Sequence, residues 1–191
     1  MSESKLFTLY QDHSETLEQS LAINADRLEG YAKTLAEALA SGQKLIIVAS
    51  GFLAGVAATL NNAFLYRLEV ERPSLPVVTL DHNYGLAATM SSDGNYEQFF
   101  DCQLAAQASV GDHVLILDSS ADAALMAALK SAIQLDCNTA VISYADENSW
   151  KKENPDLMFP IVSSAPARGV EAVLFLGLVL CEMVEAELFG F

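Results

Sequence analysis

The chain has 191 residues, of which 52% are hydrophobic, and carries a net charge of −15 at pH 7. This length suits one domain, residues 1–191, with a substantial buried core. The excess of 25 Asp and Glu over 10 Lys and Arg argues against direct nucleic-acid binding, because the phosphate backbone would be repelled.

The cysteines and the chain start bear on the cellular compartment. None of the three cysteines belongs to a C-x-x-C pair or lies beside a histidine, so we expect reduced thiols, no disulfide framework and no metal site. The start of the chain has no apolar signal core, and the longest apolar run is too short to span a bilayer. We therefore expect a cytoplasmic protein with no cofactor and no membrane partner.

The first 42 residues predict a pair of helices. Apolar positions recur at helical spacing from about residue 6 to 21 and from about residue 25 to 40, and Gly42 offers a stop after the second run. We expect this pair, residues 1–42, to serve in oligomerisation. Residues 43–191 are then expected to form the α-β-α core.

Five short apolar runs in the remaining chain predict strands, separated by stretches long enough for helical crossovers. The first run leads from Lys44 into Ser50, and the others cover about 76–80, 113–117, 139–143 and 157–162. Their near-continuous hydrophobicity is typical of parallel strands covered on both faces. The predicted fold class is α/β, a three-layer α-β-α sandwich around a five-stranded parallel sheet.

The last predicted helix, about residues 166–188, is apolar nearly all round between Val170 and Leu180. A helix without a polar face must be enclosed, and in a small chain another subunit can supply the second wall. We therefore expect a homo-oligomer, a tetramer built as a dimer of dimers.

Two strand-to-helix turns hold the candidate ligand-binding residues, namely Ser50, Gly51, Asp118, Ser119 and Ser120. A strand that passes through small residues into a helix presents backbone N–H groups to an anion. Side-chain donors are sparse here, and Asp118 places a carboxylate where a phosphate would lie. Two like charges at about 4 Å repel by about 1 kcal/mol in water and by more in a partly buried pocket.

A structural role competes with ligand binding at these turns. Ser119 with Asp122 fits a capping box at the start of a helix, whereas Ser50, Ser119 and Ser120 could still hold a weak anion or a neutral sugar. The three histidines are predicted to occupy a solvated helix face, a loop and a strand edge rather than to act as catalytic bases. They are His13, His82 and His113.

Several segments together resemble the sugar-isomerase (SIS) domain, in the branch that contains phosphoheptose isomerases and the DnaA initiator-associating protein DiaA. They are the N-terminal helices, the strand-turn-helix at 45–60, Glu71–Pro76, Tyr96–Phe100, Gly111-Asp112, Ala167-Arg168, Glu171 and Leu180–Glu182. The resemblance covers nearly the whole chain. Glu71–Pro76 and Leu188-Phe189 are more similar to DiaA than to the isomerases.

The departures from this branch concern its active site. The isomerases read Gly-Asn-Gly-Gly-Ser and Ser-Thr-Ser-Gly-Asn-Ser at the two turns, whereas this chain has Ala49–Leu53 and Asp118–Ala123. The resemblance places Ala63 at the position of the catalytic glutamate and Val173 at that of the histidine. Neither side chain can move a proton, so the family's isomerisation lacks its base and its acid.

The chain end carries a possible partner-binding edge, because large apolar residues there either fold back on the core or mark an interaction surface. The resemblance to DiaA implies that Arg72, Leu188 and Phe189 contact a partner, such as a DnaA-type initiator or another basic protein. Our leading hypothesis is therefore a non-catalytic SIS-domain oligomer that regulates by binding protein. The alternatives are a phosphosugar-binding protein or isomerase with a rebuilt site, and a structural partner of an active paralogue.

Overall fold

The computed structural model describes residues 4–68, 71–80, 83–163 and 165–190. The described elements, in chain order, are α1 Lys5–Ala40, β1 Leu45–Ala49, α2 Leu53–Leu65, β2 Val77–Thr79, α3 Tyr84–Ser92, η1 Tyr96–Gln98, α4 Phe99–Gln107, β3 His113–Asp118, α5 Ala123–Gln134, β4 Asn138–Ser143, α6 Glu147–Lys151, β5 Leu157–Pro160 and α7 Pro166–Phe189.

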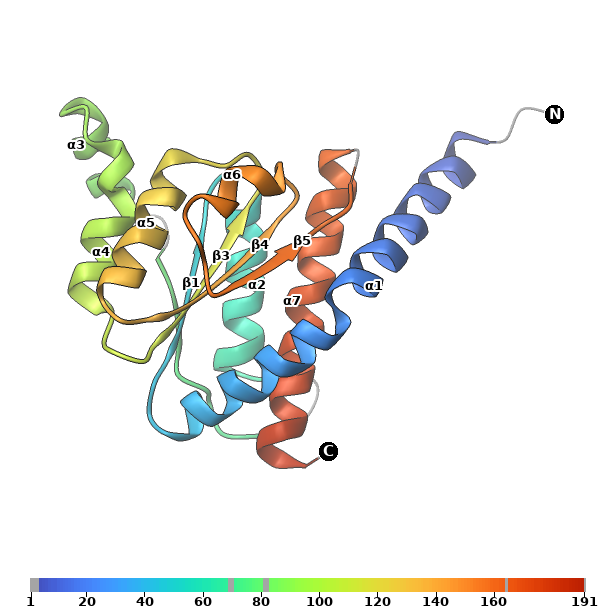
Figure 1. Ribbon diagram of the computed structural model, residues 1–191, viewed down its shortest axis with the longest axis horizontal. Coiled ribbons are helices and arrows are strands. Elements are labelled where there is room, and N and C mark those ends of the chain that lie inside the picture. Colours follow the sequence, from blue (N-terminus) through green and yellow to red (C-terminus); the bar gives the residue numbers. More distant parts are fainter. Residues whose placement is uncertain (1–3, 69–70, 81–82, 164, 191) are drawn as a thin grey trace.

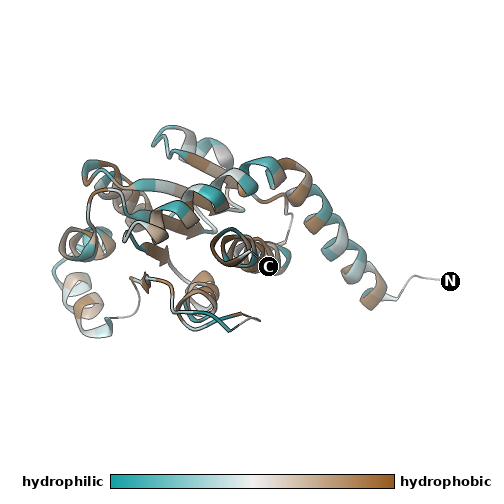
Figure 2. Cartoon of the chain, turned by 90° about the horizontal axis from the view of Figure 1, so that it is seen from below, coloured by the Kyte–Doolittle hydropathy of each residue, from teal (hydrophilic) through white to brown (hydrophobic). Residues whose placement is uncertain are grey.

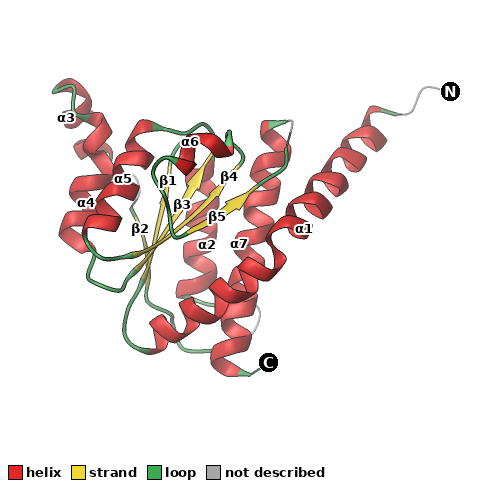
Figure 3. Cartoon of the chain, viewed as in Figure 1, coloured by secondary structure: helices red, strands yellow, loops and turns green. Residues whose placement is uncertain are grey.

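The sheet has five strands in the order β2-β1-β3-β4-β5, and every pairing is parallel. Figure 3 shows the strands crossing the middle of the molecule with helices on both sides. The predicted α/β class and the five-stranded parallel sheet are confirmed. Each predicted strand is found, with ends that differ by one or two residues.

Two cores lie on the two faces of the sheet, because side chains alternate along each strand. In β1, Leu45 and Ile47 face the core shared with α1, α2 and α7, whereas Ile46 and Val48 face the core shared with α4 and α5. Both cores are almost fully shielded from solvent. The three-layer sandwich therefore follows from strands that are apolar on both faces.

The N-terminal region is one helix of 36 residues, and the expectation of two helices was wrong. Between the two predicted helices the sequence has neither Gly nor Pro, so nothing stops the helix there. Asn24 sits at the expected break and is fully buried. Its side-chain amide donates to the carbonyls of Ser20 and Pro160, which anchors α1 to the end of β5.

The N-terminal half of α1 extends away from the body of the molecule, as Figures 1 and 2 show from two sides. Its first turns expose large apolar side chains to solvent. We call these residues the α1 arm: Leu6, Phe7, Leu9 and Tyr10, which are between 41% and 78% exposed. Such a cluster on a projecting helix is typical of a surface that another chain covers.

The long apolar helix α7 packs against α1 and α2 within the chain. It lies close to α2 at Gly177, where an added Cβ would lie 2.4 Å from Leu60 Cδ1. Helix α1 of the same chain therefore covers part of the apolar surface of α7 that we expected another subunit to cover. One strip of α7 stays partly exposed, including Phe175 at 36%, and oligomerisation remains a prediction.

The last strand is shorter than predicted, because the chain leaves the sheet after Pro160. The N–H of Ile161 still donates to Ser143, whereas the N–H of Val162 donates to the Ser20 hydroxyl of α1. Among the described residues, no helix is long and apolar enough to cross a membrane.

Candidate functional site

The candidate site lies at the carboxyl end of the sheet, where the strand order changes direction. From β1 the chain continues to β2 on one side, whereas β3 leads on to β4 and β5 on the other. In open α/β sheets, ligands bind in the crevice at such a switch point. The two turns singled out in the sequence, after β1 and after β3, meet there.

Asp118 at the end of β3 is 1% exposed and is the central group of the site. Its carboxylate accepts hydrogen bonds from the backbone N–H groups of Ser120 and Ala121 at 3.1 and 3.0 Å, with a longer one from Asp122 at 3.4 Å. Two further bonds come from the Ser143 hydroxyl at 2.8 Å and from the Trp150 indole at 2.9 Å.

The carboxylate of Asp118 therefore takes up the backbone donors that a phosphate would need from this turn. Charge-assisted bonds from five donors stabilise the buried charge without a paired cation among the described residues. A phosphate brought to the same N–H groups would meet this negative charge at close range and be repelled. The Asp118 carboxylate is thus the anion that this turn binds.

The capping box predicted from Ser119 and Asp122 is wrong. Asp122 itself is the N-cap of α5, and its carboxylate accepts from the N–H of Ala124 at 2.8 Å. Ser119 is half-buried and Ser120 is exposed, and neither caps the helix. The bonds from Asp118 shape the turn instead, and they hold Ala121 at a φ of 57°, a conformation uncommon for alanine.

The first turn contacts the second through a long hydrogen bond. The Ser50 hydroxyl lies 3.5 Å from Asp122 Oδ2, so the polar group of this turn faces the cap of α5. Gly51 adopts a φ of 57°, and Phe52 next to it is 85% exposed. Phe52 is the N-cap residue of α2, and no side chain caps that helix.

The positions that the resemblance assigns to catalysis are buried among apolar groups. Ala63 is 5% exposed and Val173 is fully buried, and both belong to the core shared by α1, α2 and α7. Neither position offers a titratable atom to the crevice. Proton transfer at these two positions is chemically impossible.

Arg72, expected to contact a partner, has a buried and paired guanidinium in this structure, so it has a structural role within the chain. Its side chain is fully buried and its Nε donates to Glu185 Oε1 at 2.6 Å, while its Nη2 donates to the Ala63 carbonyl at 2.7 Å. The pair lies beside Cys181, whose burial raises the pKa of the thiol to about 12. Arg72 therefore fixes the segment after α2 to the end of α7.

Leu188 and Phe189, the other predicted partner contacts, are partly buried and pack against the core on the α7 face of the sheet. Folding back on the core is the alternative to partner binding that the sequence allowed for these residues. Their role toward a partner stays a prediction. Phe191 and His82 lie outside the described residues.

A cavity of about 500 Å³ opens between the first turn and the start of α7. Its lining is mostly apolar, from Phe52, Pro166 and Val170, with Glu171 as the charged member. Glu171 accepts from Arg168 at 2.6 Å and lies 2.6 Å from His13 Nδ1 on α1. His13, predicted to be simply solvated, thus tethers α1 to α7.

Sequence reasoning missed the partners that complete this arrangement. Trp150 and Ser143 approach Asp118 from α6 and β4, 32 and 25 residues further along the chain, and no local pattern links them. The one available signal was the unpaired Asp118 at the end of an apolar strand, which needs donors wherever it is buried. No cluster of three or more His, Cys, Asp or Glu suited to a metal ion occurs among the described residues.

Comparisons with known proteins agree with this architecture. No family model matches the chain. It is 25% identical to the phosphoheptose isomerase of Halorhodospira halophila, covering 99% of this chain and 97% of that protein. It is 28% identical to the phosphoheptose isomerase of Thermodesulfovibrio yellowstonii, covering 98% and 93%.

Solved structures give the same result. The phosphoheptose isomerase of Neisseria gonorrhoeae superposes with a TM-score of 0.83 at 16% identity, over 95% of this chain and 97% of that one. The sugar isomerase domain of the RpiR transcription factor from Sphaerobacter thermophilus superposes with a TM-score of 0.62 at 16% identity, over 96% and 91%. The chain therefore has the fold of the phosphoheptose isomerases and is similar to them in sequence over nearly its whole length.

Proposed function

We propose that this protein is a non-catalytic SIS-domain protein that assembles with further copies of itself and acts by binding another protein. The observation that carries the proposal is the Asp118 carboxylate, which occupies the backbone donors of the β3–α5 turn. A protein that still handled a sugar phosphate there would have to displace a buried, five-fold hydrogen-bonded charge.

The buried positions of Ala63 and Val173 support the same proposal. Aldose–ketose isomerisation moves a proton between two carbons and needs a base and an acid within hydrogen-bond reach of substrate. Among the described residues that line the 500 Å³ cavity beside Phe52, Glu171 is the one carboxylate, and it is already bound by Arg168 and His13. On this proposal the crevice at the carboxyl end of the sheet is retained, but it has no base or acid for isomerisation.

The α1 arm and the partly exposed strip of α7 support self-association. Both expose apolar side chains, and a second copy seated on them would bury that surface. Repeated subunits would present several copies of one binding edge and raise avidity without new contacts. A tetramer is the arrangement that we expect.

The net charge of −15 supports a basic partner, because complementary charge steers encounter between proteins. A DNA-binding initiator of the DnaA type fits this description, as does any other basic protein. Leu188-Phe189 at the end of α7 is the edge that we assign to this contact.

A sugar-phosphate ligand is the second candidate, and the similarity to phosphoheptose isomerases favours it. Ser119 and Ser120 stay accessible at the crevice and could hold a sugar hydroxyl. In that case the phosphate would have to be held by groups other than the β3–α5 backbone, for example by residues lent by a neighbouring subunit.

Two assays on the purified protein test the proposal. The first measures turnover of sedoheptulose 7-phosphate, with a phosphoheptose isomerase as positive control, and no turnover above background is expected. The second measures binding of a fluorescently labelled DnaA-type initiator to wild type and to Leu188→Ala/Phe189→Ala, at two salt concentrations. Salt-sensitive binding that the double variant weakens supports the proposal. Turnover by the purified chain overturns it, and binding that the double variant leaves unchanged refutes the assigned edge.

A further inference from the structure

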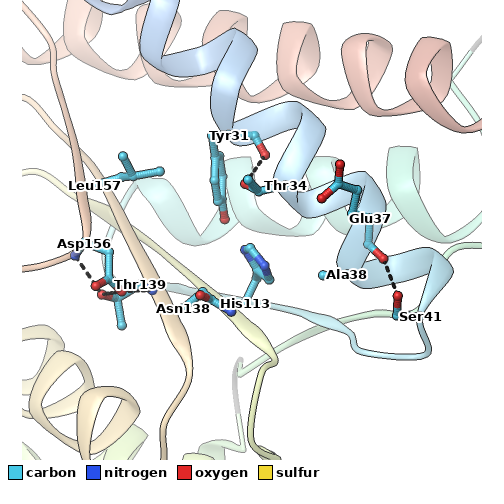
Figure 4. A pocket seen from close by; sticks show the side chains of 10 residues that line it. All are labelled: Tyr31, Thr34, Glu37, Ala38, Ser41, His113, Asn138, Thr139, Asp156 and Leu157. Atoms are coloured by element: carbon cyan, nitrogen blue, oxygen red, sulfur yellow. Dashed lines mark hydrogen bonds between the residues drawn. The ribbon is translucent and has the colours of Figure 1, made fainter.

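A second cavity, of about 350 Å³, lies at the opposite edge of the sheet from the candidate site. It is formed where the amino ends of β3, β4 and β5 meet the C-terminal half of α1. Figure 4 shows side chains from these four elements gathered round it. Its volume is that of a site for a small organic molecule rather than for one water or ion.

Two buried polar atoms at this cavity have no hydrogen-bond partner in the structure. They are the hydroxyl of Tyr31, a residue 3% exposed, and Nδ1 of His113, a residue 4% exposed. Both residues line the cavity, and their rings lie 5.6 Å apart. In Figure 4 the Tyr31 hydroxyl points toward the side on which His113 lies. Leaving such buried atoms unpaired is unfavourable, so a hydrogen-bond partner is expected for each of them.

The charges round the cavity are negative. Glu37 on α1 and Asp156 before β5 line it, and neither forms an ion pair within the described chain. Asp156 uses Oδ2 to accept from the N–H and the hydroxyl of Thr139, at 2.8 and 2.7 Å, and its other oxygen has no bond to a described residue. The neighbouring Lys44 is bound to Asp112. An anionic ligand is therefore excluded.

The protonation states leave acceptors rather than charged donors in the cavity. Burial lowers the pKa of His113, although Asp112 and Asp156 oppose the shift, so its ring is neutral at pH 7 and one ring nitrogen can accept. Burial raises the pKa of Tyr31, which keeps its hydroxyl protonated and able to accept through its lone pairs.

We propose that this cavity binds a small organic amine in its ammonium form. The ammonium group has three N–H donors, and Asp156, His113 Nδ1 and the Tyr31 hydroxyl are the acceptors on offer. Glu37 at the α1 side attracts the cation and can accept from a second amino group. A bare metal ion fits less well, because the described residues supply no group of three converging His, Cys, Asp or Glu ligands.

The test is calorimetric titration of the purified protein with putrescine, at pH 7.5 and low ionic strength. Two comparators separate the sources of any signal: 1,4-butanediol has the same length without charge, and MgCl2 supplies an inorganic cation. Saturable binding of putrescine, with no binding of the diol or of magnesium, is the expected result. No saturable response to putrescine overturns the proposal, and so does equal binding of magnesium.

Two variants locate the binding. Tyr31→Phe removes one oxygen, and Glu37→Gln removes one charge, and each should weaken putrescine binding about tenfold. The matched controls, at exposed positions that do not line the cavity, are Tyr66→Phe and Glu29→Gln, which should bind as wild type does. Weakening in all four variants, or in none, places the amine elsewhere and refutes the site.

A stability measurement guards against misreading the variants. Because the Tyr31 hydroxyl is unpaired, Tyr31→Phe without ligand should unfold at the same temperature as wild type or higher. A lower midpoint would show that the hydroxyl already has a structural partner, and would count against an open acceptor. The outcome is independent of the assays on the candidate site, which lies at the other edge of the sheet.

Discussion

The carboxylate of Asp118 accepts a hydrogen bond from the indole of Trp150 at 2.9 Å, so the end of β3 is fixed to α6. Trp150 is the chain's one tryptophan and is fully buried. Its fluorescence therefore reports on the environment of the Asp118 carboxylate. The same carboxylate closes the turn after β3, which links the packing of α6 to the state of the candidate site.

Replacing Asp118 by Asn should lower the free energy of unfolding by about 3 kcal/mol. The amide keeps the shape but loses the charge, and its NH₂ group would face N–H donors that need an acceptor. Urea unfolding followed by Trp150 emission measures the loss. The control, Asp146→Asn, removes the charge of the exposed N-cap residue of the short helix α6 and should cost less than about 1 kcal/mol. Equal losses would contradict a special role for Asp118.

Breaking the buried pair between Arg72 and Glu185 should cost about 3–5 kcal/mol, because the remaining partner is left as an unpaired charge in the core. Arg72→Leu tests this by urea unfolding. The double variant Arg72→Leu/Glu185→Leu removes both charges and should be more stable than Arg72→Leu alone. Purely additive losses would show that the two residues do not depend on each other.

His113 should make the protein less stable in mild acid. Burial lowers the pKa of His113 in the folded protein from 6.5. Below pH 6.5 the unfolded chain therefore binds a proton at this residue more readily than the folded protein does. Stability is then fully present above pH 6.5 and falls as the pH drops toward the folded value. The free energy of unfolding at pH 7.5 and 5.5 measures the drop, and His113→Phe should reduce it. An unchanged drop in the variant would assign the effect to other groups.

The α1 arm should hold the oligomer together, because its apolar side chains are exposed in the single chain. Light scattering on a sizing column should find wild type as an oligomer and Leu6→Ser/Phe7→Ser/Tyr10→Ser as a smaller species. Tyr66→Ser, at a 68% exposed position outside the arm, is the control and should behave as wild type. A monomeric wild type would refute the assignment.

Prediction from sequence succeeded where local pattern decides the structure. Apolar runs such as 113–117 became buried strands of a parallel sheet, and α7 was placed within one residue of its observed end. The single helix α1 was missed because the apolar positions were divided into two runs, about 6–21 and 25–40, although no Gly or Pro separates them.

Prediction failed where tertiary contacts decide the role of a side chain. Arg72 was assigned to a partner because its segment resembles DiaA, but Glu185 lies 113 residues away and draws it into the core. Asp118 was expected to place a carboxylate at the turn after β3, but the five donors that hold it come from three parts of the fold and could not be predicted. Tyr31 and His113, which face the second cavity, carry no local signal in the sequence.

The most direct test asks whether the turn after β3 still binds phosphate. Wild type is titrated with sedoheptulose 7-phosphate, and binding is followed by Trp150 emission and by calorimetry. Because Asp118 already fills the backbone donors, we expect no saturable change in either signal. Saturable binding that shifts Trp150 emission would show that a phosphosugar reaches the turn and displaces the carboxylate. That result would contradict the observation on which the non-catalytic assignment rests.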